Sequence, residues 1–190
     1  LTESFIKELH RILKNGTSDS RKDWFAVGEY KKLPNEVGGN DTTLPENVAD
    51  EMRELLADYN ALPAKTFEDI VAFHVAFERI HPFADGNGRI SRLMMNAELT
   101  AAGQTKIIVP TVFRPDYIGA QRRLSRDGDP EVLVAAMARL WEFGRWLSFG
   151  DFETMKSRLE KSGAFLDDDG VILRFGNEGS ELIDTVKLIQ

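Results

Sequence analysis

The chain contains no cysteine, which excludes disulfides and thiolate metal sites and fits a cytoplasmic protein. It also lacks any uninterrupted run of about 18 apolar residues, so no membrane span is expected. Basic residues do not dominate, because 24 Lys and Arg stand against 31 Asp and Glu and the net charge is −7. This balance argues against a nucleic-acid or anionic-membrane surface, so any anion site must be local.

Helical periodicity is what the sequence does have, and it predicts a mainly α fold. With 190 residues the chain is long enough for one domain with a sizeable core. Apolar side chains recur at helical spacing in six stretches, at about residues 1–13, 45–60, 66–81, 88–103, 114–125 and 130–147. The third stretch is apolar around most of its circumference, which predicts a buried helix.

One segment near the N-terminus interrupts the helical pattern. Residues 24–43 begin with a β-leaning run and continue with the turn formers Pro34, Asn35, Gly38 and Gly39. This composition predicts a surface β-hairpin or an extended flap.

A second change of pattern follows Gly150. A polar helix over 151–162 and a small β element around 171–173 are expected there. We therefore divide the chain into a domain over 1–149 and a C-terminal appendage over 150–190.

The most informative stretch is HPFADGNGRISR, His81 to Arg92. Pro82 ends the buried helix, and the turn at Gly86, Asn87 and Gly88 starts the next one. A helix start exposes unpaired N–H groups, and flanking glycines let backbone amides approach an anion. The sequence therefore predicts a phosphate cradle at this turn.

Charged residues extend the cradle. Arg89 and Arg92 lie on the first turn of the same helix and add forked donors, which predicts a polyphosphate site. Asp85 is a hard oxygen ligand that suits Mg²⁺ bridged to phosphate. An unperturbed histidine has a pKa of about 6.5, so His81 is the residue expected to take a proton from a hydroxyl near neutral pH.

Together these residues resemble the motif HxFx[DE]GNGRxxR of the Fic/DOC family, and they match it at every specified position. The resemblance implies a Fic-type helical bundle with a β-hairpin flap, in which residues 1–13 form the early helix. It also implies a protein adenylyltransferase that transfers AMP from ATP to a Ser, Thr or Tyr hydroxyl of a target protein.

The resemblance carries roles onto individual residues. His81 would deprotonate the acceptor, and Asp85 would hold Mg²⁺ between the α- and β-phosphates. The anion hole would be lined by Gly86, Asn87 and Gly88, with help from Arg89, while Arg92 would hold the terminal phosphate. Phe83 would be a core anchor, and the other two histidines, His10 and His74, would be packing or surface residues.

The flap and one tyrosine complete the expected site. The flap would align the acceptor segment by strand-like pairing, through Leu33, Pro34, Asn35, Glu36, Val37, Gly38 and Gly39. Tyr117 occupies the place where related sequences have an aromatic near the base, although core packing of its helix explains it equally well.

Other functions stay open at this stage. Transfer of a different nucleotidyl or phosphate-containing group and removal of AMP use the same motif, and a non-catalytic module would bind only nucleotide or peptide. The sequence also leaves a homodimer open.

Many relatives carry an inhibitory helix with the pattern [ST]xxxE[GN]. Ser4 to Glu8 nearly fits but is followed by Leu9, and Thr42 to Asn47 fits but contains Pro45. We expect inhibition to come from a segment upstream of Leu1 or from a partner chain, or to be absent, and we expect Arg92 to be the contact of any inhibitory glutamate.

Overall fold

The computed structural model describes residues 1–110, 113–148, 151, 153–154 and 157–158. The expected polar helix and β element of the C-terminal appendage lie largely or wholly outside these residues. Six helices run over Glu3–Lys14 (α1), Pro45–Ala61 (α2), Phe67–Ile80 (α3), Asn87–Ala101 (α4), Arg114–Asp127 (α5) and Glu131–Ser148 (α6). The six helices expected before residue 150 are each present within a few residues of their predicted bounds, and the mainly α fold class is confirmed.

The helices begin where local chemistry favours a start. Thr2 caps α1, since its side chain accepts a hydrogen bond from the Phe5 amide, and Pro45 occupies the first turn of α2. At α3, Thr66 and Asp69 satisfy each other's backbone amides in a capping box. Such caps are short-range signals, which explains why the sequence predicts them well.

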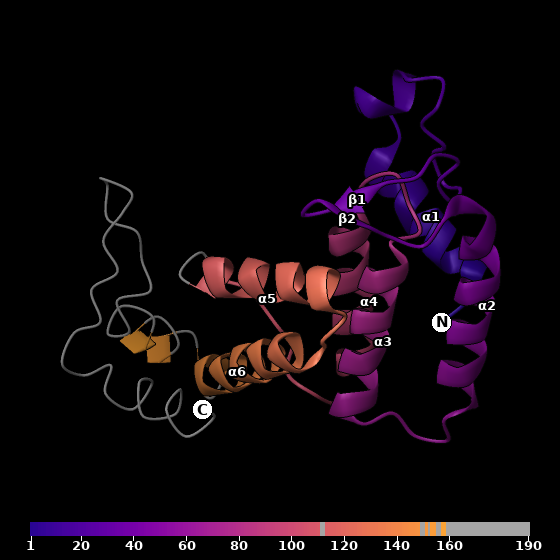
Figure 1. The fold of residues 1–190 in the computed structure, drawn as a ribbon. Coiled ribbons are helices and arrows are strands. Elements are labelled where there is room, and N and C mark those ends of the chain that lie inside the picture. Colours follow the sequence, from indigo (N-terminus) through magenta and orange to yellow (C-terminus); the bar gives the residue numbers. More distant parts are fainter. Residues whose placement is uncertain (111–112, 149–150, 152, 155–156, 159–190) are drawn as a thin grey trace, which may run out of the picture. The chain divides into compact units, whose positions relative to one another are not determined.

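The chain forms two compact units. The first comprises Leu1–Gln104 and Arg122–Pro130, and the described residues of 105–121 and from Glu131 onward belong to the second. In the first unit α3 packs against α2 and α4, and α1 packs against both α2 and α4. Figure 1 shows α3 and α4 side by side in the first unit.

Helix α3 is the buried centre of the first unit, as its apolar circumference predicted. Its buried side chains are Ile70, Val71, Phe73, His74, Val75, Phe77 and Ile80. They meet buried residues of the flanking helices, among them Met52 of α2 and Met94 of α4. The C-terminal end of α3 is thereby fixed, and His81 follows it directly.

The expected flap contains a small antiparallel hairpin, with β1 at Glu36–Val37 and β2 at Asn40–Asp41. Glu36 pairs with Asp41 and Val37 with Asn40. Two parts of the expectation are wrong. The run from Trp24 onward forms turns and irregular backbone rather than a strand, and the segment is not wholly on the surface, because Phe25 and Lys31 are buried.

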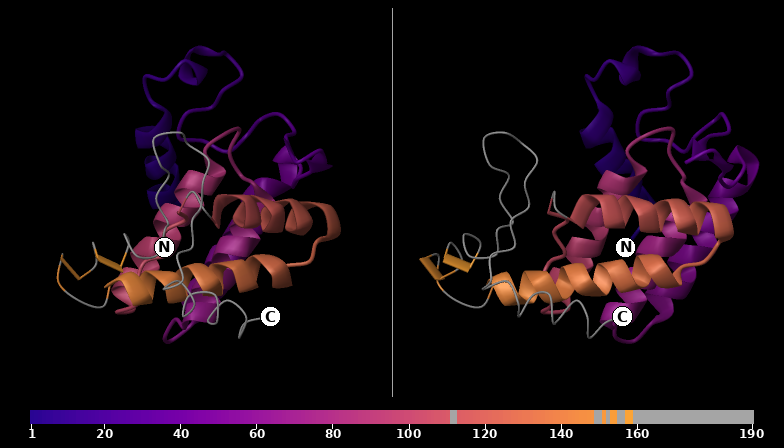
Figure 2. Two further views of the ribbon diagram at one scale, coloured as in Figure 1. Left: turned by 90° about the vertical axis from the view of Figure 1, so that its left-hand side faces the viewer. Right: turned by 60° about the vertical axis from the view of Figure 1, so that its left-hand side comes forward.

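The second unit contains α6 and the first part of α5, which lie beside each other in both views of Figure 2. Phe113 and Phe143 meet edge to face with ring centroids 5.4 Å apart, and Leu133, Met137 and Leu140 are buried. Among the described residues, no helix combines the length and apolarity that crossing a membrane would require.

Candidate active site

His81 caps the C-terminal end of α3 with an uncommon backbone conformation. Its φ of 51° and ψ of 59° are left-handed, and it is the one non-glycine residue with positive φ that the described part of the chain contains. For a residue with a Cβ this conformation costs on the order of 1 kcal/mol. The structure holds it because Pro82 follows, and Pro cannot continue the helix.

The imidazole of His81 is largely withdrawn from solvent. Its Nδ1 atom is buried and has no hydrogen-bond partner among the described residues. Burial lowers the pKa of His81 to about 4, and the positive charge of Lys31 acts in the same direction. His81 is therefore neutral at pH 7, which is the form that can accept a proton. The sequence predicted the base but not the size of this shift.

The turn before α4 has the geometry of an anion cradle. Gly86 is the N-cap of α4 with φ of 91°, and no side chain caps this helix. The positive φ of Gly86 favours glycine, and a Cβ there would lie 2.9 Å from Leu13 Cδ2, so the end of the Leu13 side chain would have to shift for any other residue. The first amides of α4 are thereby left without a side-chain acceptor, as the sequence predicted.

The side chain of Asn87 turns away from this cradle. It is buried, its Oδ1 accepts from the Phe83 amide at 2.8 Å, and its Nδ2 donates to the Phe83 carbonyl at 2.7 Å. Any contribution of Asn87 to anion binding must come from its backbone, and its side chain fixes the loop between His81 and α4.

Phe83 anchors the same loop in the core, as expected. It is fully buried, and the ring of His10 stacks on it with centroids 4.1 Å apart and planes 8° apart. His10 is held in turn by the Gly28 amide, which donates to its Nδ1 at 2.9 Å. His10 is thus a packed residue, as predicted, and it supports the motif from α1.

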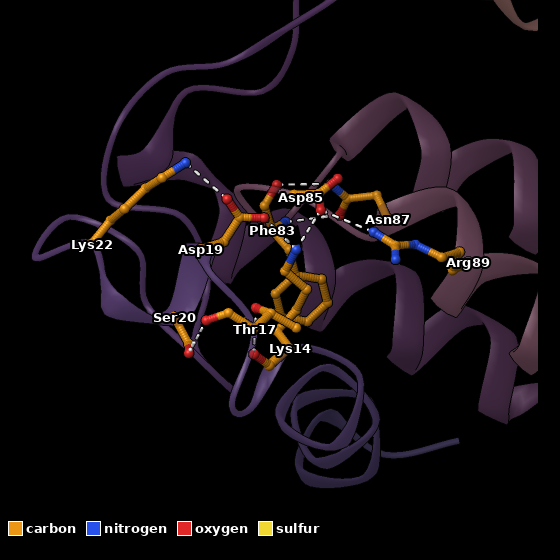
Figure 3. A network of polar contacts seen from close by, with 9 residues as sticks. All are labelled: Lys14, Thr17, Asp19, Ser20, Lys22, Phe83, Asp85, Asn87 and Arg89. Atoms are coloured by element: carbon orange, nitrogen blue, oxygen red, sulfur yellow. Dashed lines mark hydrogen bonds and ion pairs between the residues drawn. The ribbon is translucent and has the colours of Figure 1, made fainter.

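Asp85 sits in an ion-pair network that the sequence did not predict (Figure 3). Lys14 Nζ lies 2.6 Å from Asp85 Oδ2 and 2.7 Å from Asp19 Oδ2, and Arg89 donates to the same Asp85 oxygen at 2.9 Å. Partial burial by itself would raise the pKa of the Asp85 carboxyl. The hydrogen bonds from Lys14 and from the Gly86 amide outweigh this effect, so the pKa is lowered.

Lys14 is the residue that the motif could not reveal. Its side chain is 4% exposed, and it follows Ile6 and His10 at spacings of four along the buried face of α1. This spacing was the available signal, since a lysine on an apolar helix face requires a buried partner.

The metal-binding capacity of this region rests on one carboxylate. Within the described ranges, no group of three or more His, Asp or Glu side chains gathers as a metal cage would require. Mg²⁺ commonly binds through one or two carboxylates together with substrate phosphates. The half-exposed Asp85 beside the α4 N-terminus fits that second mode, in which the metal arrives with a polyphosphate.

The side chains of Arg92 and Glu78 approach each other beside Gly88, in the first turn of α4. A Cβ on Gly88 would lie 3.1 Å from Arg92 Nη1 and 3.6 Å from Glu78 Oε1, so both side chains converge there. Burial raises the pKa of Glu78 to about 7. The Ser91 hydroxyl contacts His74 Nδ1 nearby, which confirms that His74 is a packed residue.

Tyr117 is buried in α5, and its hydroxyl accepts a hydrogen bond from Gln121 Nε2 at 2.9 Å. Both residues belong to the second unit. A place for Tyr117 beside the base stays a prediction.

Curated proteins with similar sequences are named as protein adenylyltransferases. Protein adenylyltransferase Fic of Drosophila melanogaster is 31% identical over 141 residues, which cover 73% of this chain and 27% of that protein. Protein adenylyltransferase fic-1 of Caenorhabditis elegans is 27% identical over 162 residues, covering 83% of this chain and 30% of that protein. The chain therefore spans less than a third of the length of these two relatives.

Solved structures give the same family. A Fic-domain-containing signaling protein of Bacteroides thetaiotaomicron is 28% identical with a TM-score of 0.58, over 92% of this chain and 65% of that one. The Bartonella tribocorum effector BepC, solved with bound AMPPNP, shares the fold at 17% identity and a TM-score of 0.59, over 73% of each chain. The sequence profile of the Fic/DOC family matches residues 1–99, which include the whole His81 to Arg92 motif. The chain therefore belongs to the Fic/DOC family.

Proposed function

We propose that this chain is a protein adenylyltransferase, which transfers AMP from ATP to a Ser, Thr or Tyr hydroxyl of a target protein. The observation that carries the proposal is the position of a neutral His81 at the end of α3, a few residues before the uncapped N-terminus of α4. The similarity to protein adenylyltransferases at 31% and 27% identity supports it.

The proposed step is a displacement at the α-phosphorus. The imidazole of His81 takes the proton of the acceptor hydroxyl, and the acceptor oxygen forms a bond to the α-phosphorus. The bond from that phosphorus to the oxygen bridging the α- and β-phosphates breaks, and pyrophosphate leaves with the electron pair. A base that is neutral at pH 7 is ready for this role without first losing a proton.

The cradle would bind the triphosphate. The backbone amides of Asn87 and Gly88 offer donors at a helix N-terminus, which favours negative charge, and the Gly86 amide would join them once a ligand competes for its bond to Asp85. Arg92 would hold the terminal phosphate, and Arg89 would assist once a ligand competes for its contact with Asp85.

Asp85 would hold Mg²⁺ at this site. When bound there, Mg²⁺ would supply positive charge that stabilises the phosphates. On the protein side, Lys14 and Arg89 balance the charge of Asp85 before a ligand arrives.

The hairpin would dock the acceptor. Strands β1 and β2 pair with each other, and Val37 is further held by Ser125 Oγ, which donates to its carbonyl at 2.8 Å. An extended acceptor segment beside residues Leu33 to Gly39 would be recognised mainly through its backbone.

Inhibition of the transfer activity would come from a segment other than the described helices. In the near match to the inhibitory pattern, Glu8 is paired with Arg11, and in the segment that fits it, Glu46 is exposed in the first turn of α2. We therefore propose that any inhibitory glutamate is supplied by a segment outside these 190 residues or by another chain, and that it contacts Arg92.

The test is incubation with Mg²⁺ and each α-labelled nucleoside triphosphate in turn, followed by detection of label on the protein itself or on lysate proteins. AMP incorporation is the expected result. UMP or GMP incorporation without AMP, or loss of AMP from a pre-modified protein without any transfer, would replace the proposal. Nucleotide binding without either reaction would indicate a non-catalytic module.

A further inference from the structure

A buried lysine lies just before the hairpin in the chain. Lys31 is 3% exposed, whereas its neighbour Lys32 is exposed. Burial of an ammonium is costly unless its donors are satisfied. Lys31 Nζ donates to Asn35 Oδ1 at 2.7 Å and to Thr42 Oγ1 at 2.6 Å, and the Ile80 carbonyl lies at 3.4 Å. All three donors therefore have an oxygen to contact.

The first two acceptors close the base of the hairpin. Asn35 precedes β1 and Thr42 follows β2. The Thr42 amide donates to the Asn35 carbonyl at 3.3 Å, and the Thr42 hydroxyl lies 3.0 Å from the same carbonyl. The ammonium of Lys31 thus fastens both ends of the hairpin at a single point.

The same cluster is bonded to the backbone on both sides of His81. The Lys31 amide donates to the Pro82 carbonyl at 2.8 Å, and Asn35 Nδ2 donates to the Phe83 carbonyl at 2.9 Å. Ile80, whose carbonyl faces Lys31 Nζ, is the last residue of α3, where a cation compensates the helix dipole. The hairpin is therefore held by carbonyls immediately before and after the base.

One carbonyl also connects the hairpin to the start of α4. The Phe83 oxygen accepts from Asn35 on one side and from Asn87 on the other. Among the described residues, no hydrogen bond joins Lys31, Asn35 or Thr42 directly to the amides of Gly86 to Gly88. The cluster reaches the cradle only through the shared Phe83 carbonyl, so its loss should affect the hairpin and the base more than the cradle.

We propose that Lys31 is a positioning residue which, through Asn35 and Thr42, holds the hairpin at a fixed place beside His81 and so sets where the acceptor docks. This inference rests on the proposed function. A displacement of about 1 Å between reacting groups reduces rates up to about 100-fold. Loss of the ammonium should therefore reduce transfer while leaving nucleotide binding intact.

The experiment compares Lys31→Met, Lys31→Arg and the matched control Lys32→Met. Calorimetry with AMPPNP and Mg²⁺ measures nucleotide binding, and labelling from α-labelled ATP measures transfer. For Lys31→Met we expect transfer to fall about 10- to 100-fold with AMPPNP affinity within about twofold. Lys31→Arg should recover most of the transfer because it keeps a charged donor, and Lys32→Met should behave as wild type.

Hydrogen exchange separates this inference from the proposed function. In Lys31→Met the amides of residues 31–43 should exchange about tenfold faster, with no change in α4. If wild type transfers no label, the proposed function fails, but the exchange result still tests the cluster. Should Lys31→Met not fold, Thr42→Val, which removes one acceptor, gives the same readouts. Unchanged exchange and transfer in a folded variant, or an equal loss of AMPPNP affinity, would overturn the inference.

Discussion

The ammonium of Lys14 lies 2.6 Å from Asp85 Oδ2, so the acidic residue of the motif is already neutralised by a buried lysine from α1. The same nitrogen lies 2.7 Å from Asp19 Oδ2 (Figure 3). Because both carboxylates share one cation, the N-terminal helix and the loop after it are connected electrostatically to the motif. A cation that binds Asp85 must compete with Lys14.

Replacement of Lys14 by Met should destabilise the protein and make its stability depend on divalent cations. The change removes the one buried cation that Asp19 and Asp85 share, and leaves only the exposed Lys22 beside Asp19 and the exposed Arg89 beside Asp85. We expect a loss of about 1 to 3 kcal/mol in the free energy of unfolding, less than for a fully buried pair because both carboxylates are partly exposed. Urea denaturation with and without Mg²⁺ measures it, and Mg²⁺ should recover part of the loss.

Lys22→Met is the matched control, since Lys22 pairs with the same Asp19 at 2.8 Å but is itself exposed. It should cost less than about 1 kcal/mol. Equal effects of the two changes, or a Mg²⁺ response as large in wild type, would contradict the role given to Lys14.

Replacement of His81 by Ala should abolish transfer without abolishing nucleotide binding. In the proposed reaction the imidazole acts on the acceptor hydroxyl, whereas the cradle and Arg92 would contact the phosphates. We expect labelling to fall at least about 100-fold and AMPPNP affinity to change by no more than about twofold. Transfer that persists at the wild-type rate would remove His81 as the base.

All three histidines should titrate well below the ordinary pKa of the imidazole. Burial lowers the pKa of His10 and His81 to about 4 and that of His74 to about 3. Between these values and 6.5 the unfolded chain binds more protons than the folded one, so stability falls as the pH drops through this window. NMR titration of the imidazole signals tests the pKa values, and an inflection near pH 6.5 in the folded protein would contradict them.

Glu78 has the opposite effect on the pH dependence of stability, so it provides a control for the three histidines. Its raised folded pKa of about 7 means that the folded state binds the extra proton between pH 4.5 and 7, which adds stability as the pH falls. Three histidines outweigh one carboxyl, so the net stability should still decline on acidification. Glu78→Gln removes the opposing contribution, and urea denaturation between pH 5 and 7 should then show a steeper decline.

Replacement of Gly86 by Ala should destabilise the motif loop by more than its backbone conformation alone would cost. Gly86 and Gly103 both have positive φ, but a Cβ on Gly86 would meet Leu13 at 2.9 Å, whereas a Cβ on Gly103 would meet nothing within 4 Å. We expect about 1 kcal/mol for Gly103→Ala and about 2 to 3 kcal/mol for Gly86→Ala. Thermal unfolding of the two variants measures the difference, and equal losses would contradict the steric role of Leu13.

The features that the sequence predicted are those that local rules fix. Helix starts at Thr66 and Pro45 follow from capping and proline geometry, and the helix after Gly86 follows from a turn that spans a few residues. The expected strand after Trp24 did not form, because the following residues pack against α1 instead, as the stacking of Phe25 on His10 illustrates.

The burial of Lys31 and the ion pair of Lys14, which the sequence did not predict, depend on contacts with residues far along the chain. Nothing in the sequence distinguishes Lys31 from Lys32, yet one is buried against the end of α3 and the other is exposed. Lys14 carried a periodicity signal, but its partner Asp85 is known only once α1 lies beside the motif.

By itself the sequence determined the helices and predicted which residues are the candidate base, acid and cradle, because these predictions depend on residue type and on spacing over one or two turns. Only the tertiary structure decided the protonation of His81, the counter-ion of Asp85 and the anchor of the hairpin. Charge stabilisation and burial depend on distances between atoms that the folded chain brings together from separate helices, and the order of residues does not specify those distances locally.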